Sequence, residues 1–261
     1  MAEVFKMTLS IIVPVYNAAP FLRRCLDSIP IREDVEVIII DDASTDGSSG
    51  ICDEYNFHVV HFPSNRGVSA ARNCGIKHAD GDFITFLDAD DYYTENAIDI
   101  MLGAIKDYGA DYDMIQFNHY VRRVSGEIAT KGTNAHGEFK PPIMPRLFCY
   151  VWNKVYKREL IDRFDIKFLT DMHYGEDEIF NLMCLMLTGR LFNHCERTVI
   201  HSRENEGSLS RTPDADALVL MANRIAGFLT VDYLPDGMSE MLRQLLANVW
   251  DSTIYKKRFG G

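Results

Sequence analysis

Residues 9–42 read LSIIVPVYNAAPFLRRCLDSIPIREDVEVIIIDD, and this stretch decides the fold class. An apolar run at 9–15 is followed by an amphipathic segment at 19–29 and by a second apolar run at 35–40. Continuous apolar runs are typical of strands covered on both faces, and apolar residues three and four positions apart are typical of helices. Strand, helix and strand at this spacing predict a parallel α/β unit.

The same alternation continues along the next part of the chain. The further strands are expected at 57–62, 82–87 and 112–117, and the further helices at 47–55, 67–79 and 94–108. A polar segment rich in Gly and Pro at 127–145 predicts a loop or hairpin. Beyond it we expect a strand and helix at 151–164, a helix at 175–190, a strand from 197 that runs into a polar loop, and two closing helices.

The composition is that of a globular protein with a formal net charge of −11, which argues against broad nucleic-acid binding. Six cysteines occur without a CxxC pair and indicate reduced thiols. No apolar run is long enough for a membrane span, and the first residues lack the features of a signal peptide. We therefore expect a cytoplasmic protein that must neutralise an anionic substrate locally, with arginines or a bound cation.

Polar residues follow each of the first four predicted strands. They are Tyr16 and Asn17, then Asp41 and Asp42, then Asn65 and Arg66, and finally Asp88, Asp90 and Asp91. Ligands of open α/β sheets bind outside the carboxyl ends of the strands, so four such clusters on one edge predict a binding site.

Several of these residue types suit a nucleotide. The ring of Tyr16 can stack on a base, and the carboxylate of Asp42 can accept the imide N–H of uracil. Gly67 opens a helix whose N-terminus favours phosphate. Helix capping by Asn17 and a solvated loop position for Asp42 are the structural alternatives.

Asp88 and Asp90 predict a metal site. In extended backbone, residues i and i+2 point the same way, and carboxylate oxygens suit Mg²⁺ or Mn²⁺ with a diphosphate completing the shell. A solvated turn is the alternative, and the charge balance favours the metal.

Taken together, SIIVPVYNAAPFLRRCLDSI, VEVIIIDDASTDGS, NRGVSAARNCGI and GDFITFLDADD resemble glycosyltransferase family 2, the inverting nucleotide-sugar transferases of GT-A fold. The resemblance covers residues 9–120, and VWNKVYKREL with GEDEIF is similar to the acceptor side of bacterial capsule and lipopolysaccharide enzymes. It implies a Rossmann-like, mostly parallel sheet flanked by helices. It also implies a donor-binding half at 1–120, an acceptor and base half at 121–212, and a C-terminal helical extension at 213–261.

The resemblance also implies roles for single residues. Those assigned to the nucleotide are Pro14, Tyr16, Asn17, Asp42, Asn65, Gly67, Arg72 and Asp88. Asp90 would hold Mn²⁺ or Mg²⁺, with Asp88 and His201 as further candidate ligands, although His201 stands where the family commonly has an aromatic residue. Those assigned to a loop over the diphosphate are Arg203, Ser208 and Arg211.

Asp177 would be the general base, with Glu176 in reserve. The alternative is that these acids only complement the helix dipole, which would also keep the pKa of Asp177 low. The closing helix carries an apolar stripe of Leu242, Leu245, Leu246, Val249 and Trp250, for which packing on its own domain or contact with a membrane surface are the two interpretations.

The expected activity is transfer of a sugar from a nucleotide diphosphate, UDP by preference, to a glycan or lipid-linked acceptor in surface polysaccharide synthesis. The alternatives are a sugar nucleotidyltransferase, which would need a Gly-rich loop absent from VPVYNAAPF, and a non-catalytic nucleotide-sugar-binding protein. Peripheral contact with the inner face of the membrane and oligomer formation are left open.

Overall fold

The computed structural model describes residues 8–132, 135–139, 150–205 and 215–250. Within these residues ten strands form one sheet, in the order β3-β2-β1-β4-β9-β6-β10-β5, with β7 beside β6 and β8 beside β10. The strands are β1 Leu9–Val15, β2 Val35–Asp41, β3 His58–His61, β4 Phe83–Phe86, β5 Tyr92–Tyr93, β6 Met114–Arg122, β7 Ile128–Lys131, β8 Gly137–Phe139, β9 Lys154–Lys157 and β10 Leu191–Ser202. The helices are α1 Ala19–Asp27, α2 Ser48–Cys52, α3 Val68–His78, α4 Ala97–Tyr108, α5 Arg158–Phe164, α6 Glu176–Thr188, α7 Ala215–Phe228 and α8 Met238–Trp250.

Strands β1, β2, β3 and β4, which form the α/β repeat, are parallel, as the sequence predicts. β1 pairs with β2 on one side and with β4 on the other, and β2 pairs with β3. The rest of the sheet is mixed, because β9 runs antiparallel to both β4 and β6, whereas β10 runs parallel to β6. β9 therefore joins the first half of the chain to the second within one sheet.

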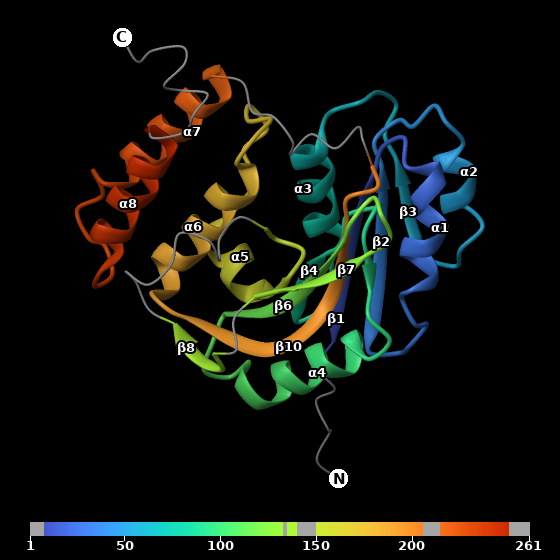
Figure 1. Ribbon diagram of the computed structural model, residues 1–261, viewed down its shortest axis with the longest axis horizontal. Helices are drawn as coiled ribbons and strands as arrows, with labels where there is room; N and C mark the ends of the chain where they lie inside the picture. The colour runs from blue at the N-terminus through green and yellow to red at the C-terminus, as the bar shows by residue number, and fades with distance from the viewer. Residues whose placement is uncertain (1–7, 133–134, 140–149, 206–214, 251–261) are drawn as a thin grey trace.

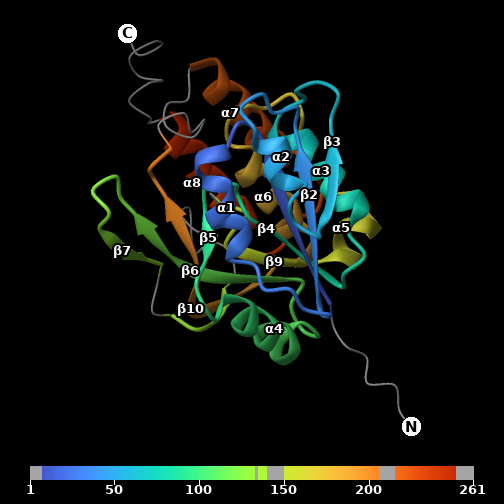
Figure 2. The same ribbon diagram turned by 90° about the vertical axis from the view of Figure 1, so that its right-hand side faces the viewer.

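Helices cover both faces of this sheet (Figures 1 and 2). Alternate residues of β1 point to opposite faces: Ile11 packs in the core with α1 and α4, and Ile12 packs in the core with α3 and α6. Helix α3 approaches β1 closely at Gly75, where an added Cβ would lie 2.3 Å from Ile12. This close contact fixes α3, which carries Arg72, against the middle of the sheet.

The C-terminal helices pack on the same domain. In Figure 1, α7 and α8 lie together on the side of α6 away from β1–β3. Met238, Met241, Leu242, Leu245 and Val249 of α8 are buried in the core. The packing interpretation of the closing helix is therefore confirmed for Leu242, Leu245 and Val249 of its apolar stripe, while Leu246 is half-buried and the side chain of Trp250 lies outside the described residues. Among the residues described above, no helix has both the length and the apolar content needed to cross a membrane.

Candidate active site

The carboxyl ends of β1, β2 and β4 meet at one edge of the sheet, where most of the predicted nucleotide residues lie. Tyr16 directly follows β1 and is 50% exposed, so its ring is accessible to a planar ligand. Pro14 is buried within β1, opposite Ile40 of β2. Asn65 lies exposed in the connection between β3 and α3. Of these three residues, Tyr16 offers the largest accessible apolar surface.

Asp42 holds the loop that leads into α3. Its Oδ1 accepts the N–H of Arg66 at 2.7 Å, and its Oδ2 accepts the N–H of Gly67 at 2.8 Å. Gly67 has a φ of +86°, which favours glycine, and α3 begins at the next residue. The solvated alternative for Asp42 is wrong, because the residue is buried and both oxygens bind backbone. Each oxygen keeps a lone pair that can accept a ligand N–H.

Asn17 ties two loops together instead of capping α1. Its side-chain oxygen accepts the N–H of Thr45 at 2.8 Å, and its own N–H donates to Ser44 Oγ at 3.0 Å. The cap position of α1 is Ala18, and the first helical N–H, that of Ala19, donates to Asp46 at 3.0 Å. The capping interpretation of Asn17 is therefore wrong. The backbone of Asn17 adopts the left-handed conformation, with a φ of +49°, and its side chain binds the neighbouring loop instead of the helix.

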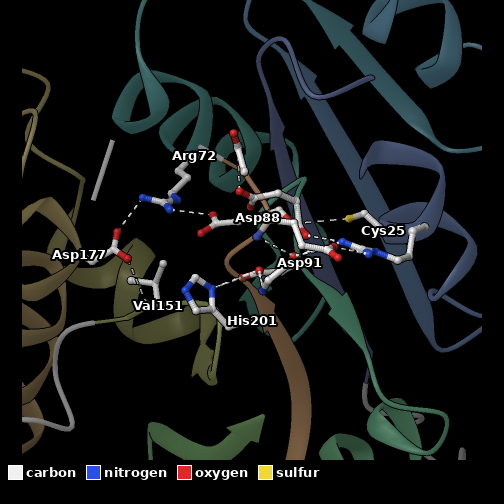
Figure 3. Close-up of polar contacts among 12 residues, drawn as sticks. Cys25, Arg72, Asp88, Asp91, Val151, Asp177 and His201 are labelled. Carbon is white, nitrogen blue, oxygen red and sulfur yellow. Dashed lines mark hydrogen bonds and ion pairs between the residues drawn. The ribbon is translucent and has the colours of Figure 1, made fainter. Parts of the chain in front are cut away.

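Arg72 is the buried centre of the site. Its Nη2 donates to Asp88 Oδ1 at 2.9 Å, and its Nη1 donates to Asp177 Oδ1 at 2.6 Å and lies 3.4 Å from Glu176. The side chain is 3% exposed and faces the ring of Phe168. Figure 3 shows Arg72 between Asp88 and Asp177, with dashed contacts to both. The expectation that Arg72 lies beside the aspartates is confirmed, and it also reaches the acids of α6.

Asp177 has a higher proton affinity than the helix dipole alone would give. Burial raises its pKa to about 7, opposed by Arg72 and by the N–H of Val151, and supported by the charges of Glu176 and Asp88. The expected low pKa is wrong, because the Asp177 side chain is only 14% exposed and its carboxyl loses most of its hydration. A pKa near 7 suits a general base that works at neutral pH.

Asp88, Asp90 and Asp91 lie in a turn after β4, where the N–H of Asp91 donates to the carbonyl of Asp88 at 2.9 Å. The expected extended backbone is therefore wrong, and the two predicted ligands do not point the same way by strand alternation. Asp88 pairs with Arg72, whereas Asp90 Oδ2 accepts from Asn205 at 3.0 Å. Burial and the nearby charge of Asp88 raise the pKa of Asp90.

His201 is oriented by Asp91. Its Nδ1 lies 3.1 Å from both carboxylate oxygens of Asp91, and its ring stacks on Trp152. Burial lowers the pKa of His201, but the hydrogen bond and charge of Asp91 outweigh it and raise the pKa. Histidines that ligate metals are commonly held in this way, with one ring nitrogen on a carboxylate and the other on the metal. Figure 3 shows the imidazole contacting Asp91 on one side.

The residues fit a metal that is shared with a substrate. Among the described residues, no group of three His, Cys, Asp or Glu side chains is placed to hold a metal ion. Mg²⁺ and Mn²⁺ in nucleotide sites are usually held by one or two carboxylates together with substrate phosphates. Asp90, with Asp88 and His201 nearby, supplies that kind of incomplete shell.

The predicted diphosphate residues are only partly described. Arg203 follows β10, is exposed, and donates its backbone N–H to the carbonyl of Arg122 at 2.9 Å. Ser208 and Arg211 lie outside the described residues. The sequence did not point to the neighbouring network, in which Glu204 accepts from Arg24 at 2.7 Å and from Arg122 at 3.1 Å. Arg24 also lies 3.3 Å from the carbonyl of Asp90, so this network borders the metal turn.

Comparisons with known proteins identify the family and the fold. The family model described as glycosyl transferase family 2 matches residues 10–167. An uncharacterized glycosyltransferase of Bacillus subtilis, EpsJ, is 33% identical over 232 residues, which are 80% of this chain and 64% of EpsJ. The poly(ribitol-phosphate) beta-N-acetylglucosaminyltransferase TarS of Staphylococcus aureus is 24% identical over 212 residues, 77% of this chain and 36% of TarS. The chain spans less than two thirds of the length of these relatives.

Solved structures share the fold. Residues 1–349 of S. aureus TarS in complex with UDP-GlcNAc match with a TM-score of 0.81 at 21% identity, covering 97% of this chain and 74% of that one. The mannosyltransferase PcManGT of Pyrobaculum calidifontis in complex with GDP-Man and Mn²⁺ matches with a TM-score of 0.63 at 19% identity, covering 95% and 70%. The expected GT-A fold is confirmed. Because the family model covers more than half of the chain, including Asp42 and Asp88 at strand ends and Arg72 in α3, the chain belongs to glycosyltransferase family 2.

Proposed function

We propose that the protein transfers a sugar from a UDP-sugar to an acceptor hydroxyl with inversion of configuration, and that Asp177 is the general base. The observation that carries this proposal is the buried Arg72, which holds Asp88 on the donor side and Asp177 on the α6 side at once. A guanidinium with two arms on two carboxylates fixes their separation, as catalysis by positioning requires. Asp177 lies beyond the segment matched by the family model, so its role rests on this geometry.

The two oxygens of Asp177 have different surroundings. Oδ1 accepts a short hydrogen bond from Arg72 at 2.6 Å, whereas Oδ2 has a long contact of 3.4 Å with the N–H of Val151. We assign Oδ2 as the atom that takes the proton of the acceptor hydroxyl. The hydroxyl oxygen forms a bond to the anomeric carbon on the face opposite the nucleotide, and the bond from that carbon to the diphosphate breaks.

The donor would lie across the strand ends. The exposed ring of Tyr16 stacks on the base, the free lone pairs of Asp42 accept the uracil imide, and Asp88 contacts the ribose. The solved TarS complexes with UDP-GlcNAc and UDP support a uridine nucleotide. Asp90, with Asp88 and His201, would hold Mn²⁺ or Mg²⁺, which supplies Lewis-acid stabilisation of the departing diphosphate. The Mn²⁺ of the PcManGT complex supports a divalent metal.

The acceptor would be a hydroxyl of a glycan or lipid-linked saccharide. The relatives support this class, since TarS is named for transfer to poly(ribitol-phosphate). The cytoplasmic face of a membrane is where a lipid-linked acceptor would be met, and the buried residues Leu242, Leu245 and Val249 of α8 are not available for that contact.

A panel of nucleotide sugars tests the proposal. The purified protein is expected to release UDP from at least one UDP-sugar in the presence of Mn²⁺, with water as the acceptor, and EDTA should abolish the release. Calorimetry should show UDP bound more tightly than GDP or CDP. Failure to turn over any nucleotide sugar, with or without glycan acceptors, would favour a non-catalytic binding protein.

Removal of Asp90 tests the metal assignment. With Asp90→Ala, we expect UDP affinity in Mn²⁺ to fall by about tenfold, roughly 1.4 kcal/mol, and to become insensitive to EDTA, because the cation that offsets the diphosphate charge is lost. Asp99→Ala, which removes an acid from exposed surface of α4, is the control and should keep the metal dependence. Equal UDP affinity of the wild-type protein in Mn²⁺ and in EDTA would contradict the metal assignment.

A further inference from the structure

A buried lysine is linked to the proposed base through one peptide group. Lys154 is in β9, inside the sheet between β4 and β6, and is 1% exposed. Its Nζ donates to the carbonyl of Tyr150 at 2.5 Å and to Asn153 Oδ1 at 2.9 Å. Burying an ammonium is costly, and replacing a buried charge by an apolar side chain of similar volume is often neutral or stabilising. Packing alone therefore does not account for a lysine at this position.

The carbonyl of Tyr150 receives a second donor. Asn181 of α6 donates its Nδ2 to the same oxygen at 3.1 Å. The amide of Asn181 is oriented by the hydroxyl of Tyr156, which donates to Asn181 Oδ1 at 2.6 Å. Two donors, one of them charged, thus hold one carbonyl in the core.

The other end of the same peptide group faces Asp177. The peptide between Tyr150 and Val151 is planar, so fixing its oxygen also fixes the direction of the Val151 N–H. That N–H donates to Asp177 Oδ2 at 3.4 Å (Figure 3). A cation on the oxygen polarises the peptide and strengthens the hydrogen bond that its N–H makes. Lys154 therefore acts on Oδ2 through one peptide bond, without touching the carboxylate.

We propose that Lys154 is a positioning residue for Asp177, which holds the 150–151 peptide so that its N–H orients the carboxylate for proton abstraction. This inference rests on the proposed role of Asp177 as base. The other charged groups that act on Asp177 are Arg72 of α3, Glu176 of α6 and Asp88 after β4. Lys154 adds a contribution from β9, on the Oδ2 side of the carboxylate.

Lys154→Met keeps the length of the side chain and removes the charge. We expect Mn²⁺-dependent UDP release from the best UDP-sugar of the panel to fall by about 10–100-fold, with UDP affinity unchanged. The acidic limb of the pH–rate profile should move to higher pH by about one unit, because a weaker N–H donor stabilises the carboxylate less. Thr85→Val is the matched control: it removes a buried hydrogen bond to the backbone carbonyl of Lys154, at 2.8 Å, and leaves the contacts of the ammonium in place, so the limb should not move.

The outcomes separate this inference from the proposed function. Lys154→Met could instead lower the rate and the UDP affinity equally, without moving the acidic limb of the pH–rate profile. That result would mean that Lys154 has only a structural role, and it would overturn the inference. If Lys154→Met has a wild-type rate and a wild-type pH–rate profile while Asp177→Asn is inactive, the inference about Lys154 is wrong and the proposed role of Asp177 stands. If Asp177→Asn keeps turnover, Asp177 is not the base, so that part of the proposed function fails and the inference fails with it. If Lys154→Met does not fold, Lys154→Gln removes the charge but keeps a polar side chain, and an unmoved limb in that variant overturns the inference.

Discussion

Asp177→Asn is expected to lower UDP-sugar turnover by about 10²–10⁴-fold, roughly 3–5 kcal/mol of transition-state stabilisation, while folding and UDP affinity barely change. Asparagine keeps the size of the side chain, and its oxygen can still accept from Arg72, but it cannot take a proton at neutral pH. Arg72 also keeps its contacts with Asp88 and Glu176, so no buried charge is left without a partner. The measurement is steady-state UDP release beside calorimetric UDP binding.

The pH dependence gives the same prediction a second readout. The base must be ionised, and burial raises the pKa of Asp177 to about 7. Turnover of the wild-type protein should therefore rise about tenfold per pH unit up to about pH 7 and level above it. The residual activity of Asp177→Asn should lack this limb.

Glu176→Gln is the control, since Glu176 also borders Arg72, at 3.4 Å. We expect it to keep most of its turnover. If Asp177→Asn is active and Glu176→Gln is inactive, the general base is Glu176 and not Asp177. If both variants are active, the acids only complement the N-terminus of α6, and Asp177→Ala should then cost stability rather than turnover.

The sequence predicted the parallel part of the fold because its signals are local. β1 and β4 are mainly apolar, and both are buried along their whole length. Gly67 ends one loop and opens α3 at the expected position. Since parallel strands end at one edge, the polar residues that follow them are brought together without further information.

The contacts that build the site depend on residues far apart in the chain. Arg72 meets Asp177 across 105 positions, and Arg24 meets Glu204 across 180. No periodicity encodes such pairs, because they arise from where β9 and β10 enter the sheet. The N–H of Val151 is a backbone group and has no signature in the sequence. These contacts could be found only from the structure.

The direction of the pKa shift of Asp177 was also beyond the sequence. The first turn of a helix lowers the pKa of an acid, and that effect is visible from Glu176, Asp177 and Glu178 alone. Burial of the same turn raises the pKa and is larger, but it depends on how α6 packs against the sheet. For Glu178, burial likewise raises the pKa to about 7. Local dipoles can be predicted from sequence, whereas desolvation is a property of the tertiary fold.

Arg72→Met should destabilise the protein by about 3–5 kcal/mol, because it leaves Asp88, Glu176 and Asp177 without their buried cation. The pKa of the Asp177 carboxyl should rise, because Arg72 lowers it in the wild type. A carboxyl whose pKa is higher in the folded state stabilises the fold below its unfolded pKa, and this contribution is lost as the pH rises through the folded value. In the wild type the folded value for Asp177 is already about 7, so the further rise in the variant adds to the deficit only as the pH passes that value. The deficit against wild type in urea denaturation should therefore be smallest near pH 4 and largest near pH 8.

Arg72→Lys separates the charge of Arg72 from its geometry. A lysine restores one positive charge, but its ammonium cannot span Asp88 and Asp177, which the two arms of the guanidinium contact separately. We expect Arg72→Lys to recover part of the stability near pH 8 and to leave UDP-sugar turnover lower than wild type by about 10²-fold, because the separation of the two carboxylates is no longer fixed. Arg23→Met, which removes an exposed ion pair with Glu54, should change neither quantity appreciably. Wild-type turnover in Arg72→Lys would mean that only the charge of Arg72 matters. The simultaneous contact of its guanidinium with Asp88 and Asp177 would then not be the feature that organises this site.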